Sequence, residues 1–464
     1  MKFVAILLGT AGVGLMGLFN APLQLILSVT GLGITFSAVR DISEANESGD
    51  KSKIAQTITT LMRWSWFAGI LGSTITIFLS PFLSQWTFGN HDYTWAFIWL
   101  SLTLLIQTLS KGQIAVLQST RRLNDLAKAN VFGSLFGLFT TIPLYYYFGL
   151  KGIVPSLIIT ALTSLVLSWY FSRKVKIEKV SMTYRETYDS GKNMVKLGLV
   201  ITVTGIIGFF TAYVLNAFIS RTGGVDQVGL YNAGWSIIGQ STGLIFAAMT
   251  TDFFPRLSAV NKDDSKVSLL VNQQAEMVIL ILAPILILLI GAMPLVIRIL
   301  YTPDFLPVIK FANWMLVGIL LKGLVWPVGF IFPAKGDLKV FGTIEIAAMI
   351  FNVITNILGY HFFGLEGLGV SFILDYIFGL GLTFYFAFKK YGFSYNLLTI
   401  KAFFISLFLV IIVFLTPYFF EGPISIFFGA IVFILSAIYS FFELDKRLGL
   451  KATINNLIRK LFLT

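Results

Sequence analysis

The chain has 464 residues, of which 56% are hydrophobic and 12% are charged, and its net charge is +12. A soluble globular protein carries roughly 25% charged residues, so this composition excludes an ordinary soluble domain and predicts an integral membrane protein. The chain contains no cysteine and two histidines, which excludes disulfides, a cysteine nucleophile and a zinc motif built from these two residue types.

A transmembrane helix needs about 20 mostly apolar residues, and thirteen segments of this kind follow one another along the chain. An apolar stub, Phe3 to Gly9, precedes them and is too short to span a bilayer. We therefore predict an all-α polytopic membrane protein. The predicted spans are 13–39, 64–89, 93–110, 129–150, 152–172, 197–220, 228–251, 277–297, 311–334, 340–360, 367–388, 402–420 and 422–442.

The basic residues alternate from one side of these spans to the other. The loops of one set, with the C-terminal tail, hold 27 Lys and Arg, whereas the other set holds four. Cytoplasmic loops carry the excess of basic residues, so the first set and the tail are predicted to be cytoplasmic. The same rule explains the net charge, and we expect no nucleic acid partner. The tail resembles a short basic amphipathic helix on the inner leaflet.

Two stretches of the chain repeat each other at an offset of 215 residues. Tyr145–Ile158 ("YYYFGLKGIVPSLI") and Tyr360–Ile373 ("YHFFGLEGLGVSFI") agree at seven of fourteen positions, and "VGL" occurs at 13–15 and again at 228–230. Chance similarity between turns rich in glycine and leucine is the alternative explanation. Because an even number of spans separates the copies, the repeat predicts two parallel six-helix lobes, as in carriers that alternate access between two halves.

The repeat also predicts the domain organisation. The stub stands where the second copy has a full helix, 197–220, so the first helix looks truncated by roughly 15–20 residues and Met1 need not be the true start. Counting that helix, we expect about fourteen transmembrane helices. The predicted parts are an N-lobe of helices 1–6 (1–172), a basic cytoplasmic linker (173–196), a C-lobe of helices 7–12 (197–388), two extra transmembrane helices (402–442) and a basic cytoplasmic tail (443–464).

The run Gly9–Asp50 resembles the start of the Wzx-type flippases, which move undecaprenyl-diphosphate-linked O-antigen or related oligosaccharides across the bacterial inner membrane. The matching features are the turn before "VGLMGL", the "GLGI", the polar "ISEANESGD" and the outer turns "FGLKG" and "FGLEG". The resemblance covers both lobes. It implies the multidrug/oligosaccharidyl-lipid/polysaccharide flippase superfamily, which also includes MATE-type exporters and lipid II flippases.

The resemblance further implies a secondary transporter and not an enzyme. It implies a multi-pass protein of the bacterial inner membrane with a cytoplasmic C-terminus. The implied partners are the lipid-linked oligosaccharide, the lipid bilayer and the polysaccharide polymerase machinery. No cofactor is expected other than a coupling ion, and the sequence leaves H⁺, Na⁺ and neither open.

Charged side chains at membrane depth are costly and usually functional. Lys322 lies in the middle of span 311–334 and Asp375 in the middle of span 367–388. Lys322 is predicted to bind the diphosphate or an acidic sugar, since an ammonium suits phosphate. Asp375 is predicted to bind the coupling ion. The alternative is that the two residues form a structural ion pair.

Four further charges are weaker candidates. Glu345, about one turn from the cytoplasmic end of its span, is a second coupling carboxylate or an interfacial charge. Arg298 and Lys310 flank one outer turn and contact either substrate or lipid headgroups. Arg40, at an inner helix end, meets the diphosphate or is an ordinary loop charge.

Two other functions are weighed against flipping from the cytoplasmic to the periplasmic leaflet. A MATE-type cation-coupled antiporter predicts acidic residues in the N-lobe spans, which contain no Asp or Glu. A polytopic glycosyltransferase or polymerase needs an acid or base cluster at a membrane face, and every outer loop is short. The chain lacks G-x-x-x-x-G-K-[ST], so it encodes no P-loop ATPase.

Overall fold

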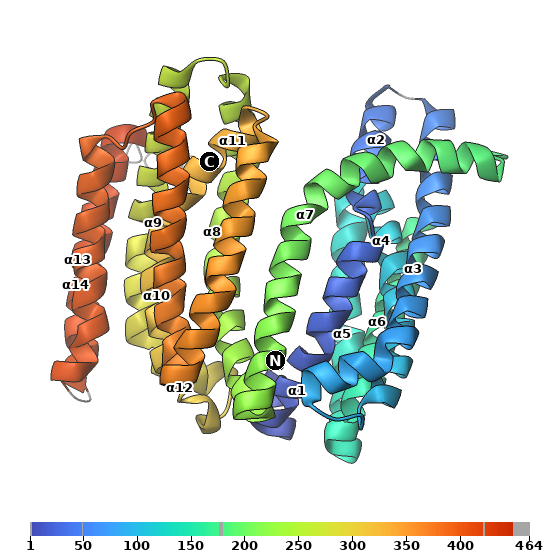
Figure 1. Ribbon diagram of the computed structural model, residues 1–464, viewed down its shortest axis with the longest axis horizontal. Coiled ribbons are helices and arrows are strands. Elements are labelled where there is room, and N and C mark those ends of the chain that lie inside the picture. The colour runs from blue at the N-terminus through green and yellow to red at the C-terminus, as the bar shows by residue number, and fades with distance from the viewer. Residues whose placement is uncertain (1, 49, 176–179, 421–422, 449–464) are drawn as a thin grey trace, which may run out of the picture. The chain divides into compact units, whose positions relative to one another are not determined.

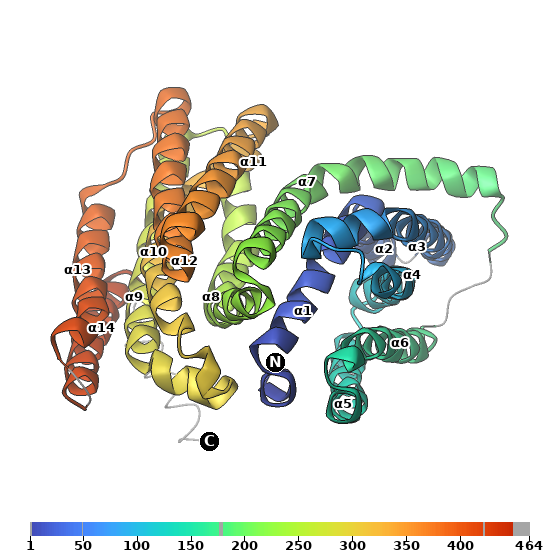
Figure 2. The ribbon, with the colours of Figure 1, turned by 60° about the horizontal axis from the view of Figure 1, so that its bottom comes forward.

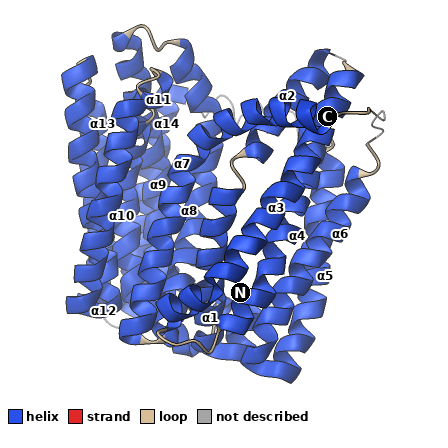
Figure 3. Ribbon diagram, turned by 45° about the vertical axis from the view of Figure 1, so that its right-hand side comes forward, coloured by secondary structure: helices blue, strands red, loops and turns tan. Residues whose placement is uncertain are grey.

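The structure, a computed structural model, describes residues 2–48, 50–175, 180–420 and 423–448. These residues form α-helices and two short 3-10 helices, and no strand occurs among them (Figure 3). The predicted class, an all-α polytopic membrane protein, is confirmed. The chain folds into two compact units. The N-unit runs to Leu230 and the C-unit begins at Tyr231.

Nine helical segments of the described chain are long and apolar enough to cross a membrane. Two of them have 50 and 54 residues. A straight helix of that length would measure about 75–80 Å against a hydrocarbon core of about 30 Å, so each has the length of two crossings. The total of about fourteen stays a prediction. The segments are Lys2–Thr30, Lys51–Phe88, Thr94–Ser119, Leu123–Ser172, Asp264–Leu300, Val308–Ala334, Leu338–Tyr391, Leu397–Phe419 and Ile424–Arg447.

The N-unit differs from the predicted spans at its first helix. The predicted span 13–39 is wrong at its C-terminal end, because the helix stops at Thr30 and restarts at Ile34. Leu32 and Gly33 both have positive φ angles, 50° and 62°. The helices of this unit are α1 (Lys2–Thr30), α2 (Ile34–Ser48), α3 (Lys51–Phe88), α4 (Thr94–Ser119), α5 (Leu123–Phe148), η1 (Gly149–Gly152), α6 (Ile153–Ser172), α7 (Tyr184–Gly223) and the start of α8 (Val225–Ala259).

Helix α7 begins inside the predicted linker and is fastened to α3. Its N-cap, Thr183, forms a capping box with Glu186. The Arg63 side chain donates to the Met182 carbonyl oxygen at 3.0 Å and to the Thr187 hydroxyl at 2.7 Å. Figure 2 shows the first turns of α7 running alongside α2 and α3. Half of the basic linker is therefore a helix packed on the N-unit.

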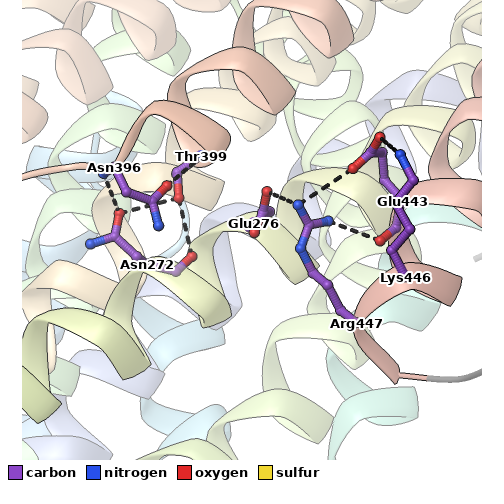
Figure 4. Close-up of polar contacts among 7 residues, drawn as sticks. All are labelled: Asn272, Glu276, Asn396, Thr399, Glu443, Lys446 and Arg447. Atoms are coloured by element: carbon purple, nitrogen blue, oxygen red, sulfur yellow. Dashed lines mark hydrogen bonds and ion pairs between the residues drawn. The ribbon is translucent and has the colours of Figure 1, made fainter.

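In the C-unit, polar contacts fix the two extra helices to α9 (Figure 4). Asn272 of α9 accepts from the Asn396 amide N–H at 2.8 Å. One turn later, Glu276, which is 3% exposed, pairs with Arg447 at 2.5 Å. The remaining helices are α9 (Asp264–Leu300), η2 (Pro303–Phe305), α10 (Val308–Gly329), α11 (Ile331–Ala334), α12 (Leu338–Tyr391), α13 (Leu397–Phe419) and α14 (Pro423–Leu448). Of the predicted tail, 443–448 continues α14 and 449–464 lies outside the described residues.

Helix α12 is a hairpin of two arms, visible in orange in Figure 1. The Asp337 carboxylate closes its open end, because it accepts from the Val340 N–H at the start and from Lys390 and Tyr391 at the finish. The hydrogen bond from Lys390 is the main cause that holds the pKa of Asp337 below its usual value. The arms are therefore joined at their base as well as at the turn.

The predicted repeat appears as the same backbone geometry in both copies. Gly149 has φ 55° and ψ −135°, and Gly364, 215 residues later, has φ 59° and ψ −140°. Gly9 and Gly224 share the offset and have φ 64° and 85°. Only glycine adopts such angles without strain. Each "FGLxG" motif thus needs its first glycine to turn the chain from one helix into the next.

In both copies of the repeat, the helices before and after the turn approach each other closely. A Cβ at Gly152 would lie 2.4 Å from the Leu144 carbonyl oxygen. The equivalent Cβ at Gly367 would lie 1.9 Å from the Gly359 carbonyl oxygen. The second glycine of each motif therefore lets backbone pack on backbone, a usual role of small residues between membrane helices.

The "VGL" copies meet each other within the N-unit. A Cβ at Gly14 would lie 2.1 Å from the Val225 carbonyl oxygen, and one at Gly229 would lie 2.0 Å from the Thr10 carbonyl oxygen. Both pairs of positions, 14 with 229 and 10 with 225, are related by the offset of 215. The crossing of α1 with α8 is therefore the same contact made twice, as at a two-fold axis. It agrees with a parallel repeat, whereas the lobe boundaries stay a prediction.

This crossing predicts the effect of one added methyl group. Gly229→Ala should lower the melting temperature of the purified protein in detergent, because overpacking typically costs about 1–3 kcal/mol. Gly239→Ala is the matched control on the same helix, since a Cβ there meets nothing within 4 Å. Equal melting temperatures for the two variants would contradict the close crossing.

Candidate functional site

The most elaborate polar cluster inside the C-unit surrounds Asp375. This carboxylate lies on the second arm of α12, and three side chains of the first arm donate to it. The Thr355 hydroxyl donates to Asp375 Oδ1 at 2.6 Å, and the Asn356 amide donates to Oδ2 at 3.2 Å. The Asn352 amide also donates to Oδ2. Three neutral donors therefore take the place of water around a carboxylate at membrane depth.

Aromatic side chains and a second acid stand beside this cluster. Tyr376, next to Asp375 in the chain, lies within electrostatic range of both Asp375 and Glu345. Glu345 is seven residues before Asn352, so the two share a helix face. The Trp235 ring of α8 contacts the Phe372 ring at 5.6 Å. The two predicted coupling residues, Asp375 and Glu345, thus both act electrostatically on Tyr376.

Carboxylate, hydroxyl and amide oxygens are the ligands that hard cations prefer. The Asp375 cluster offers one carboxylate and several hydroxyl and amide oxygens. This set suits the binding of a proton or of a single small cation. In the described part of the chain, no group of three or more His, Cys, Asp or Glu side chains is arranged to hold a metal ion.

Lys322 contacts an aromatic ring and forms no ion pair with Asp375. Its Nζ is 4.6 Å from the centre of the Phe246 ring. Trp326, one turn further along α10, contacts the same ring at 5.5 Å. Within the described ranges, no carboxylate lies within ion-pair distance of Lys322. The alternative interpretation of a Lys322–Asp375 ion pair therefore has no counterpart in this structure, and the ammonium rests on the face of the Phe246 ring instead.

Of the other predicted cations, Arg298 and Lys310 lie at helix ends. The predicted position of Arg40 at a helix end is wrong, because Arg40 lies in the middle of α2. Lys310 pairs with Glu366 of the "FGLEG" turn at 2.8 Å. Arg40 pairs with its neighbour Asp41 at 2.7 Å. Arg298 is exposed in the last turn of α9, where a positive charge complements the helix dipole. Their assignment to substrate binding stays a prediction.

The sequence analysis missed one charged residue, Lys111. The predicted span 93–110 ends just before Lys111, but α4 continues to Ser119, so Lys111 lies within the helix. Its side chain lines a cavity of about 200 Å³ in the N-unit. The signal that could have revealed it is the apolar run that continues beyond Lys111 as "IAVL".

Long apolar helices with isolated charges and amides within them are the architecture of a polytopic membrane protein. The same fold occurs in solved membrane proteins. The chain resembles an inward-facing MATE family multidrug resistance transporter of the MOP superfamily with 16% identity and a TM-score of 0.67, over 84% of this chain and 93% of that one. It resembles the lipid II flippase MurJ in an inward closed conformation with 13% identity and a TM-score of 0.63, over 93% and 97%.

The chain belongs to the polysaccharide biosynthesis protein family, whose model matches residues 3–310. It is 24% identical over 384 residues to a Shigella flexneri protein named "Putative O-antigen transporter", which covers 81% of this chain and 90% of that protein. The resemblance to polysaccharide flippases seen in the sequence is thereby confirmed. These relatives are named as transporters and flippases, in agreement with a transporter and not an enzyme.

The unpaired state of Lys322 can be tested by stability. Lys322→Met keeps an apolar stem and should change the free energy of unfolding by about 1 kcal/mol or less, since only a cation–π contact is lost. Arg447→Met leaves the buried Glu276 carboxylate without its ion-pair partner and should lower the free energy of unfolding by about 3–5 kcal/mol. Thermal melting in detergent compares the two. A large loss for Lys322→Met would mean that a carboxylate does pair with it.

Proposed function

We propose that the protein is a secondary transporter that flips an undecaprenyl-diphosphate-linked oligosaccharide, an O-antigen or related repeat unit, from the cytoplasmic to the periplasmic leaflet. The family match over residues 3–310 carries the proposal, together with the name of the Shigella flexneri relative. The fold shared with a lipid II flippase supports a lipid-linked substrate. The 27-to-4 distribution of basic residues supports a bacterial inner-membrane protein with a cytoplasmic C-terminus.

In this proposal Lys322 attracts the diphosphate or an acidic sugar. Its charge has no carboxylate partner among the described residues, so it is available to an anionic ligand. Arg40 in the middle of α2, and Arg298 with Lys310 at an outer turn, guide the substrate in and out. The lipid tail stays in the bilayer, and the polysaccharide polymerase machinery receives the product.

Asp375 is the proposed coupling group, with Glu345 as its neighbour. Hydrogen bonds to an ionised carboxylate are roughly twice as strong as those between neutral groups. The three donors on the first arm therefore hold the second arm most firmly when Asp375 is charged. Uptake of H⁺ or Na⁺ by Asp375 weakens or rearranges these bonds. The arms of α12 can then shift about Gly364 as the carrier changes its open side.

A MATE-type cation-coupled antiporter is the second candidate, because the TM-score with such a transporter, 0.67, is as high as that with the flippase, 0.63. The membrane-spanning segments of the N-unit argue against it. In the described residues, the only acid within them is Asp125, in the first turn of α5.

Complementation tests flipping directly. Wild type should restore surface polysaccharide in a bacterium that lacks its own O-unit flippase and makes the matching oligosaccharide. Lys322→Ala and Asp375→Asn should reduce it at least about tenfold, as expected when a charged-group contact is lost. Lys151→Ala in η1 and Asp92→Asn in a turn, both at exposed positions, should act as wild type. Membrane levels are measured for each. Failure of well-expressed wild type, with drug efflux in its place, would favour the antiporter.

The role of Asp375 predicts a specific change in energetics. Flipping by wild type should fall when a protonophore or removal of Na⁺ abolishes the ion gradient. Asp375→Asn keeps the size of the side chain but cannot ionise, so any residual flipping should no longer respond to that gradient. Surface polysaccharide measured with and without the protonophore, and with and without Na⁺, checks this. A variant that responds as wild type does would exclude Asp375 as the coupling group.

A further inference from the structure

The N-unit contains a cavity that the proposed function has not used. Its volume is about 200 Å³. Five helices, α1, α2, α3, α4 and α7, contribute side chains to it. The cavity lies where the first predicted span breaks, because Gly31, Gly33 and Ile34 all line it. Gly33 is held there by Gly198 of α7, whose carbonyl oxygen would be 2.3 Å from a Cβ on Gly33.

Lys111 gives this cavity a positive charge. It stands on α4, eight residues before the helix ends at Ser119. Across the described ranges, no carboxylate lies within ion-pair distance of it. The Lys111 side chain is exposed and lines the cavity, so its ammonium is available to an anionic ligand there. The first turn of α2, including Thr35, also lines the cavity and adds the positive end of its dipole.

The rest of the lining suits a sugar. Trp64 donates its indole N–H to the Thr187 carbonyl oxygen at 3.1 Å, and its ring stacks on Tyr188 with the two centroids 6.2 Å apart. What it offers to a ligand is the part of the ring that lines the cavity. The Thr108 and Ser65 hydroxyls donate to the carbonyl oxygens four residues earlier. Their oxygens keep lone pairs that can accept from sugar hydroxyls. One cation, one aromatic face and several acceptors match a sugar that carries a phosphate.

We propose that this cavity binds the glycosyl phosphate head of the substrate, with Lys111 on the phosphate and Trp64 against the sugar ring. The assignment rests on the proposed function and extends it, because it gives the N-unit a substrate site of its own besides Lys322. In the proposed orientation the cavity belongs to the cytoplasmic half of α4. It is therefore the site at which the substrate loads.

The site is tested by direct binding, without transport. Purified full-length protein in phosphatidylcholine nanodiscs is dialysed to equilibrium against labelled glucose 1-phosphate, inorganic phosphate or glucose. Wild type should bind glucose 1-phosphate more tightly than either of the other two. Lys111→Met should weaken that binding at least about tenfold, as expected for loss of a charge-assisted hydrogen bond. Lys111→Arg should retain it, and Lys128→Met is the control at an exposed position of the next helix.

A second variant tests the sugar contacts. Thr108→Val keeps the shape of the side chain and should weaken binding of glucose 1-phosphate while leaving that of inorganic phosphate unchanged. Equal affinity for glucose 1-phosphate and phosphate would overturn the sugar part of the proposal. Loss of glucose 1-phosphate binding when phosphatidylglycerol is added to the nanodiscs would assign the site to a lipid headgroup instead. Unchanged binding by folded Lys111→Met would overturn it altogether.

The same variants separate this site from the proposed function. Lys322→Met should leave glucose 1-phosphate binding at Lys111 intact although it impairs flipping. If wild type binds as expected but fails in complementation, the proposed function fails and the phosphate site stands. If complementation succeeds and Lys111→Met is fully active with unaltered binding, the proposed function stands and the loading site fails.

Discussion

Inside a bilayer no water is available to hydrate a polar group, so each one must find its partner within the protein. The hydroxyls of Thr30, Thr76 and Thr108 satisfy this constraint locally, since each donates to the carbonyl oxygen four residues earlier. Charges need more distant partners. Asp375 accepts hydrogen bonds from three donors on the opposite arm of α12, and Glu276 forms an ion pair with Arg447 of α14. These partnerships fix which helices lie side by side in the C-unit.

The same constraint makes the exceptions informative. Lys322 and Lys111, one in each unit, lie in apolar helices, and neither has a carboxylate partner among the described residues. Lys322 rests against an aromatic ring, and Lys111 lines a cavity. Under the proposed function each charge is completed by the anionic substrate. The carboxylate of Asp375 instead has its hydrogen-bond donors within its own hairpin. Such a group suits the proposed uptake and release of a coupling ion.

Much of the fold could be predicted, because its determinants are local. The apolar runs identified the membrane helices, and the offset of 215 located the turns at Gly149 and Gly364, which have nearly the same φ and ψ. The first predicted span was wrong where Gly31 to Gly33 break the helix. That break depends on the close approach of Gly198, a residue 165 positions away, and no local pattern contains it. The start of α7 at Tyr184 likewise depends on contacts with α3.

The candidate site was likewise predictable only in its local features. The sequence by itself determined that Lys322 and Asp375 are charges at membrane depth, because their apolar neighbours in the chain are enough to show it. The i, i+4 spacing of Asn352 and Asn356 is also enough to place both on one helix face. Only the tertiary structure decided that these amides bind Asp375, that Lys322 does not, and that Lys111 lines a cavity. A side chain's depth follows from its own helix, but its partner depends on how residues far apart in the chain pack together.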